Sequence, residues 1–236
     1  MSDAERGDRA GIGDFPILQT RDVVRGTVEA AVSLLPFGSA VSELAEVVIA
    51  PSLGKRREAW LSHVGEAVAD LQENSLTLDR LADDEEWISA LFEASRIAVG
   101  THLESKLKML QALLVRMAIE QPRSGEQVIV RRFLRFVEEL DEEHFLLLRY
   151  ASDPQRWFEQ RSLPLPSMTM GSRGSIMDAA ELGIDRPALN IIMQDLAQRE
   201  LLSAGLFSGT VTEASLYDPL TTALGNELLA WVKAFE

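Results

Sequence analysis

The stretch IMDAAELGIDRPALNIIMQDLAQRELLSAG, residues 176–205, decides the fold class of the C-terminal part of the chain. Apolar residues at helical steps predict a short helix over Ile176–Leu182, which ends at Gly183. After a tight turn, Pro187 suits the first turn of a second helix, because its missing N–H would have no partner there anyway. One face of this second helix is apolar and carries Leu189, Ile192, Met193 and Leu196.

The residues that follow predict a strand, a turn and a further helix. Ser208, Gly209 and Thr210 indicate a turn, and residues 211–217 are typical of a strand. Thr221-x-x-Leu224-Gly225 then begins a closing helix that carries several large apolar side chains. Together with Leu201-Leu202-Ser203-Ala204-Gly205 before the turn, residues 208–217 give a strand, a glycine-bearing turn and a strand after two helices, which predict a β-wing.

Helix, turn, helix and wing resemble the winged-helix fold. Two motifs in particular, Leu196-x-x-x-Glu200-Leu201-Leu202 and Leu220-Thr221-x-x-Leu224-Gly225, are similar to bacterial winged-helix regulators of the MarR and PadR sort. The resemblance covers residues 141–236, and a helix with His144, Leu147 and Leu148 is the first of its three helices. The fold expected is therefore mainly α, with a helical N-terminal region and a C-terminal winged-helix-like domain.

In DNA-binding members of this fold the second helix of the helix–turn–helix pair, which here is the helix that begins near Pro187, enters the major groove. The resemblance implies contacts from its exposed positions, which are Arg186, Asn190, Gln194, Gln198 and Arg199. Asn190 and Gln194 suit adenine and Arg186 suits guanine. Residues 141–236 nevertheless hold seven basic and fourteen acidic side chains, whereas phosphate binding needs a local excess of bases. We therefore expect this domain to pack against or dock a protein, with nucleic acid the unlikely partner.

Residues 1–14 are polar and charged, which predicts a loose tail without a signal peptide and so a cytoplasmic protein. From residue 15 to 140 the chain predicts only helices and short loops. Residues 55–71 carry one apolar stripe, and acids at residues 83–86 lie where another helix is expected to begin, which suits the dipole of that helix. We expect a flexible tail over 1–14, a helical domain over 15–140 and the winged-helix-like domain over 141–236.

An apolar segment over residues 27–53 contains Glu29, Glu43 and Glu46, and its longest run without a charge is too short for a membrane span. Acids at a bilayer centre would each cost about 2.5 to 3.5 kcal/mol. We expect two buried helices broken near Phe37, and the alternative is a membrane-active hairpin with a basic anchor. The residues of that alternative are Phe37, Lys55, Arg56 and Arg57.

The N-terminal two-thirds loosely resembles bacterial all-helical proteins related to abortive-infection alpha proteins. Lys55-Arg56-Arg57-x-x-Trp60 carries the resemblance, and Thr101-x-x-x-x-Lys106 before Leu110 adds to it. Many such proteins have no assigned activity, so the resemblance implies a membrane-associated defence effector only as an alternative function.

Composition excludes several kinds of chemistry. The 236 residues include no cysteine, so thiolate metal sites and cysteine nucleophiles are absent, and 23 basic against 37 acidic residues give a net charge of −14.

His63, His102 and His144 lie on different predicted helices, with no metal-ligand spacing, and we expect them to be partly exposed. No nucleophile elbow or phosphate loop occurs; Gly171–Ser175 comes nearest, but follows no predicted strand and indicates a linker. We expect the protein to bind no metal and no cofactor and not to be an enzyme.

Arg131, Arg132 and Arg135 form a basic cluster that either pairs with acids such as Glu138 and Glu139 or meets an acidic partner. The richness of the chain in carboxylates favours pairing within the chain. The leading hypothesis is a non-enzymatic interaction or regulatory protein with a protein partner or a second copy of itself. A DNA-binding regulator and a membrane-acting effector are the alternatives.

Overall fold

The computed structural model describes residues 50–73, 78–122, 125–166, 170–203, 210–212 and 215–233. The chain divides into two units, Met1–Lys55 and the compact Arg56–Glu236. The expected tail and residues 27–49, which include Phe37, lie outside the described ranges. The described part is mainly α-helical, as the sequence predicts.

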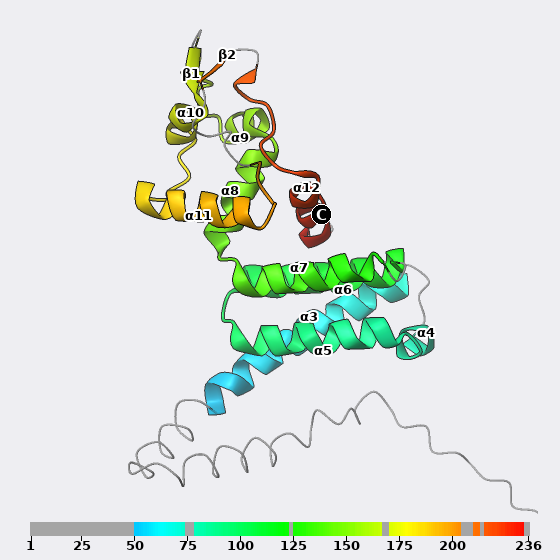
Figure 1. The fold of residues 1–236 in the computed structure, drawn as a ribbon. Helices are drawn as coiled ribbons and strands as arrows, with labels where there is room; N and C mark the ends of the chain where they lie inside the picture. The colour runs from blue at the N-terminus through cyan, green and yellow to red at the C-terminus, as the bar shows by residue number, and fades with distance from the viewer. Residues whose placement is uncertain are drawn as a thin grey trace, which may run out of the picture. The chain divides into compact units, whose positions relative to one another are not determined.

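The helices and strands follow one another in an order that Figure 1 displays. They are α3 Ala50–Glu73, α4 Leu78–Ala82, α5 Glu85–Gly100, α6 Glu104–Glu120, α7 Gln127–Glu139, α8 Glu142–Ser152, α9 Pro154–Gln160, β1 Met170–Ser172, α10 Arg173–Ala179, α11 Arg186–Gln198, β2 Thr210–Thr212 and α12 Ala223–Val232.

The helix starts follow from side-chain chemistry. At the start of α5, one carboxylate oxygen of Asp84 accepts hydrogen bonds from the backbone N–H groups of Glu86 and Trp87, at 3.1 and 3.0 Å. This satisfies donors that have no partner within the helix. The acids predicted at the start of this helix are found there, with Glu85 and Glu86 in its first turn. At α11, Asp185 caps the N-terminus, and Pro187 lies in the first turn as predicted.

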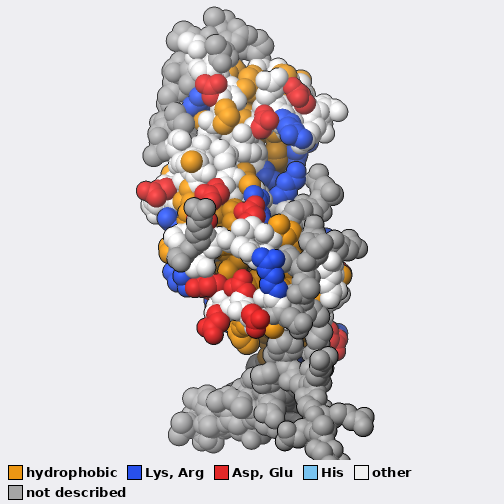
Figure 2. Space-filling model, turned by 90° about the vertical axis from the view of Figure 1, so that its right-hand side faces the viewer, with side chains coloured by type: hydrophobic (Ala, Val, Ile, Leu, Met, Phe, Trp, Pro, Cys, Tyr) orange, Lys and Arg blue, Asp and Glu red, His pale blue; other side chains and the backbone are white. Residues whose placement is uncertain are grey.

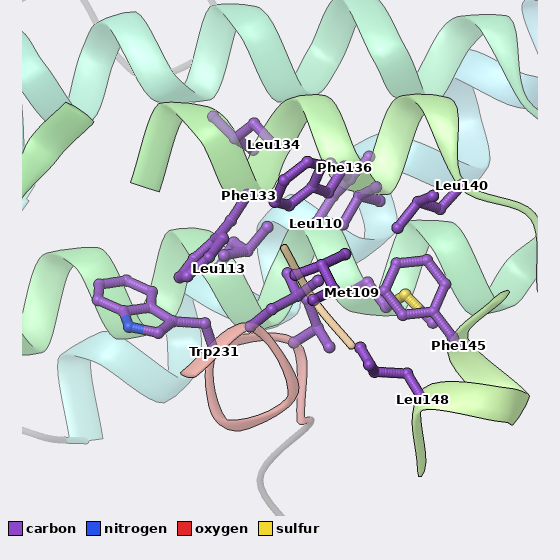
Figure 3. Close-up of a cluster of buried hydrophobic side chains, with 14 of the residues drawn as sticks. Met109, Leu110, Leu113, Phe133, Leu134, Phe136, Leu140, Phe145, Leu148 and Trp231 are labelled. Carbon is purple, nitrogen blue, oxygen red and sulfur yellow. The ribbon is translucent and has the colours of Figure 1, made fainter. Parts of the chain in front are cut away.

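One hydrophobic core extends through the described helices, and Figure 3 shows the part of it where side chains from α6, α7, α8 and α12 converge. The ring centroids of Phe133 on α7 and Trp231 on α12 lie 6.2 Å apart. Phe145 on α8 and Leu110 on α6 are fully buried nearby. Leu140, at the expected boundary between domains, is itself 0% exposed, so residues on both sides of it share one core.

The two strands differ from the predicted pattern. β1 pairs antiparallel with β2, with Gly171 opposite Val211. The linker expected over Gly171–Ser175 is wrong, because Gly171 and Ser172 belong to β1 and α10 begins at Arg173 directly after it. The expected strand over 211–217 is also wrong beyond Thr212, because residues 215–217 form a turn.

Two contacts explain that turn. Leu216 is 2% exposed, and the hydroxyl of Tyr217 donates a hydrogen bond to the carbonyl of Pro166. The adjacent Leu216 and Tyr217 thus both pack on the core, whereas neighbours in a strand point to opposite faces.

Candidate functional site

α11 presents an uncharged surface to solvent. Asn190, Ile191, Gln194 and Gln198 are exposed and recur at helical steps, and we call these four residues the α11 outer face. Ile191 is 67% exposed. The opposite side of the helix is buried in the core through Leu189, Ile192 and Leu196.

The two arginines predicted to touch DNA flank this face, and both are already paired within the chain. Arg186 donates a hydrogen bond from Nη2 to the carboxylate of Asp178 on α10. Arg199 donates from Nη1 to Oε2 of Glu139, at 2.8 Å, and from Nε to Oδ2 of Asp195, at 3.2 Å. Neither guanidinium group can reach a phosphate without competing with its own carboxylate partners.

A buried histidine fixes the position of α11. Nδ1 of His144 accepts a hydrogen bond from the backbone N–H of Asp141 at 3.2 Å, in the capping box of α8. Because Nδ1 accepts, the ring proton of the neutral imidazole lies on Nε2, which is 3.3 Å from Oδ2 of Asp195. Asp195 therefore joins His144 on α8 to Arg199, and Arg199 in turn binds Glu139 on α7. These contacts tie the C-terminal half of α11 to α7 and α8.

The expectation that all three histidines are partly exposed is wrong for two of them. His63 and His144 are each 8% exposed, whereas His102 is exposed. Nδ1 of His63 lies 2.9 Å from Oε1 of Gln111 and its Nε2 lies 3.1 Å from Oε1 of Glu104, so the ring links α3 to α6. Within the described ranges, no three or more His, Asp and Glu side chains are grouped to hold a metal ion.

A cavity of about 470 Å³ lies beside α4 and the start of α5. The side chains of Leu81 and Met117 give it an apolar part, and the four acids of residues 83–86 line it. Asp84 is occupied as the cap of α5, and Oε2 of Glu86 lies 3.8 Å from Nη1 of Arg131. The polar lining of the cavity consists of these carboxylates, the amides of Gln121 and Gln127 and the guanidinium group of Arg80, with no serine or histidine among its residues.

Two arginines of the predicted basic cluster, Arg131 and Arg132, lie near acids of the chain, though not near the acids first expected. Arg131 approaches Glu86, and Nη2 of Arg132 lies 3.9 Å from Oε2 of Glu200. Glu138 instead receives two hydrogen bonds from Arg96, at 2.8 and 2.7 Å. These hydrogen bonds hold the pKa of the Glu138 carboxyl group below its usual value.

The basic triplet proposed as a membrane anchor lies early in α3. Lys55 is exposed, Nη1 of Arg56 is 3.5 Å from the carbonyl oxygen of Val99 on α5, and Arg57 also has a partner. None of the helices described in the structure combines the length and the apolar character needed to cross a bilayer. The membrane alternative depends on residues 27–49, which lie outside the described ranges.

Two features of the site are not predicted by the sequence analysis. The first is Ile191, which has no predicted role. Ile192 lies on the predicted apolar face of the helix, and the position of Ile191 outside that face could have identified it as exposed. Of the two carboxylates that hold Arg199, Asp195 lies four residues earlier on the same helix, a spacing that could have indicated the pair, whereas Glu139 lies sixty residues earlier and nothing local in the sequence indicates it. Comparison of the chain with protein families, with curated proteins and with solved structures found no match. Function must therefore be inferred from the geometry.

Proposed function

We propose that this chain is a non-enzymatic interaction or regulatory protein, which docks a protein partner through the α11 outer face of a winged-helix-like domain. The order α8, α9, β1, α10, α11, β2 and α12 supports the winged-helix assignment, since it places one strand before the helix pair α10 and α11 and another strand after it. An enzyme would need a reactive group in a concave site. The cavity beside α4 has carboxylates, of which Asp84 and Glu86 are already engaged.

The observation that carries the proposal is the chemistry of the α11 outer face. Amide side chains can both donate and accept hydrogen bonds, and Ile191 adds apolar area at the centre. The surface has no free cation to offer a phosphate backbone, because Arg186 and Arg199 are held by carboxylates. An uncharged patch on an acidic protein suits a protein partner, because charged residues are depleted at the centre of such interfaces.

Photocrosslinking tests the proposal. A photoreactive benzoylphenylalanine placed at Gln194 should crosslink to a discrete protein in cells that make the chain naturally. The same group at Gln72, an exposed glutamine on α3, is the matched control. A product at both positions or at neither would refute docking through the α11 outer face.

One observation favours a DNA-binding regulator as the second candidate. The exposed amides of Asn190, Gln194 and Gln198 are of the type that reads adenine edges in the major groove. A gel shift with genomic fragments at low salt distinguishes the two functions. Retardation that is lost in the Asn190→Ala, Gln194→Ala double variant would support DNA binding, and no retardation at all would exclude it.

A further inference from the structure

Three arginines at the corner between α8 and α9 differ from the others in the C-terminal part. Arg149 lies in the last turn of α8, Arg156 lies on α9 and Arg161 directly follows α9; all three side chains are exposed. Within the described ranges, none of them forms an ion pair, whereas Arg173, Arg186 and Arg199 each have a carboxylate partner. We call Arg149, Arg156 and Arg161 the α8–α9 basic surface.

The absence of ion pairs here is unexpected, because acids outnumber bases by 14 in this chain. Two carboxylates do lie within residues 149–161, but each is bound to a different donor. Oδ1 of Asp153 accepts from the backbone N–H of Arg156 at 3.0 Å, as the cap of α9. Oε1 of Glu159 accepts from the side-chain amide of Gln155 at 2.9 Å. The nearest acids along the chain therefore leave the three guanidinium groups available.

Arg161 is also held in place before any partner arrives. Its Cζ lies 3.2 Å from the centroid of the Trp157 ring, in a cation–π contact. The indole itself is fixed: Trp157 is 6% exposed, its Nε1 donates to the carbonyl oxygen of Ala180 at 2.9 Å, and it packs edge-on against Tyr150. A guanidinium group stacked on a fixed ring loses little conformational freedom on binding, which removes part of the usual cost of an interface.

The surroundings suit a short-range contact with carboxylates. Figure 2 shows Lys and Arg side chains interspersed with Asp and Glu side chains on one face of the protein. Residues 149–161 carry a net charge of only +1, within a protein of net charge −14. Three arginines on a protein with so large a negative charge do not supply the dense positive potential that a nucleic-acid backbone requires. They can supply forked hydrogen bonds to individual carboxylates, for which the guanidinium geometry is well matched.

We propose that the α8–α9 basic surface binds an acidic segment of a partner protein, with side-chain carboxylates seated on Arg149, Arg156 and Arg161. This inference extends the proposed docking function by assigning a second surface, separate from the α11 outer face, and a partner chemistry. Arg161 on its Trp157 platform is the anchor, because arginine and tryptophan are the residue types that carry most energy in protein interfaces.

The test uses a fluorescein-labelled octaglutamate peptide and the full chain, with fluorescence anisotropy read at about 50 mM and about 300 mM salt. The wild-type chain should bind saturably at low salt and more weakly at high salt. The double variant Arg149→Glu, Arg156→Glu should weaken binding at least tenfold, as expected for the loss of charged hydrogen bonds. Arg135→Glu on α7 is the control, because this arginine is also exposed, lies away from the corner and should leave the affinity unchanged.

Arg161→Lys tests the platform without changing the charge. It should weaken peptide binding by roughly threefold while leaving the thermal midpoint near that of the wild type, because lysine lacks the planar fork. Circular dichroism checks that each variant is folded. If the double variant does not fold, Arg161→Lys still decides the question.

Three results would overturn the inference: no saturable binding of octaglutamate, equal loss in Arg135→Glu, or tighter binding to a DNA duplex of about 20 base pairs through the same arginines. The outcome is separable from that of the proposed function. A crosslink at Gln194 without peptide binding would remove only this surface, and peptide binding without that crosslink would remove only docking through α11.

Discussion

Gly225, in the first turn of α12, allows a close approach that no other residue permits. A Cβ atom at this position would lie 2.2 Å from the carbonyl oxygen of Leu201, and 3.2 Å from its carbonyl carbon. The clashing atom belongs to the backbone, so it cannot rotate away as the end of a side chain would. Gly225→Ala must therefore push α12 away from the segment that follows α11.

That displacement breaks specific contacts. The backbone N–H of Thr222 donates to the carbonyl of Leu201 at 3.1 Å, and Leu202 forms a β-bridge with Thr221. Overpacking costs about 1–3 kcal/mol and a lost hydrogen bond about 1 kcal/mol, while alanine returns up to about 1 kcal/mol of helix propensity. We expect Gly225→Ala to lower the free energy of unfolding by roughly 1–3 kcal/mol.

Urea denaturation followed by circular dichroism measures this change. Gly65→Ala is the matched control, because Gly65 is an exposed residue inside α3 and a Cβ atom there would meet nothing within 4 Å. It should stabilise the protein by about 0.5–1 kcal/mol. If both variants shift the urea midpoint in the same direction, the close approach of α12 to Leu201 is not a constraint on the fold.

Two further predictions concern the helical part. Asp84→Ala should lower the free energy of unfolding by about 1 kcal/mol in urea denaturation, because the N–H groups of Glu86 and Trp87 lose their acceptor; an unchanged midpoint would contradict the cap. Arg96→Ala should cost less than about 1 kcal/mol near neutral pH, because the pair with Glu138 is exposed. Since Arg96 lowers the pKa of Glu138, this stabilisation is present above the unfolded pKa of the carboxyl group and disappears as the pH falls through the folded one, so a cost that grows in acid would refute it.

Local chemistry in the sequence predicts much of the helical architecture. The apolar stripe over 55–71 lies within α3, and the acids at 83–86 mark the start of α5. Pro187 lies in the first turn of α11 as predicted, because the constraint on its backbone acts within a single residue. Such features depend on neighbours three or four positions away, which a single sequence displays directly.

The rest depends on contacts between distant residues. β1 is only three residues long, and its partner strand comes about forty residues later, so no alternation could reveal it. Arg199 was predicted as a DNA contact because it is charged and follows the second helix. Its partner Glu139 lies sixty residues earlier, beyond the reach of any local pattern. Burial of His63 and His144 likewise follows from packing between helices.

The position of α12 has a consequence for biosynthesis. It packs on α6, whose last residue precedes Ala223 by about a hundred positions. At about 5–20 residues per second, a ribosome needs roughly 5–20 s to bridge that interval. Throughout this time Leu110, Leu113 and Phe133 lack the ring of Trp231 that completes their packing. The nascent chain therefore exposes apolar side chains for many seconds, and chaperones that recognise such surfaces can bind it during this time.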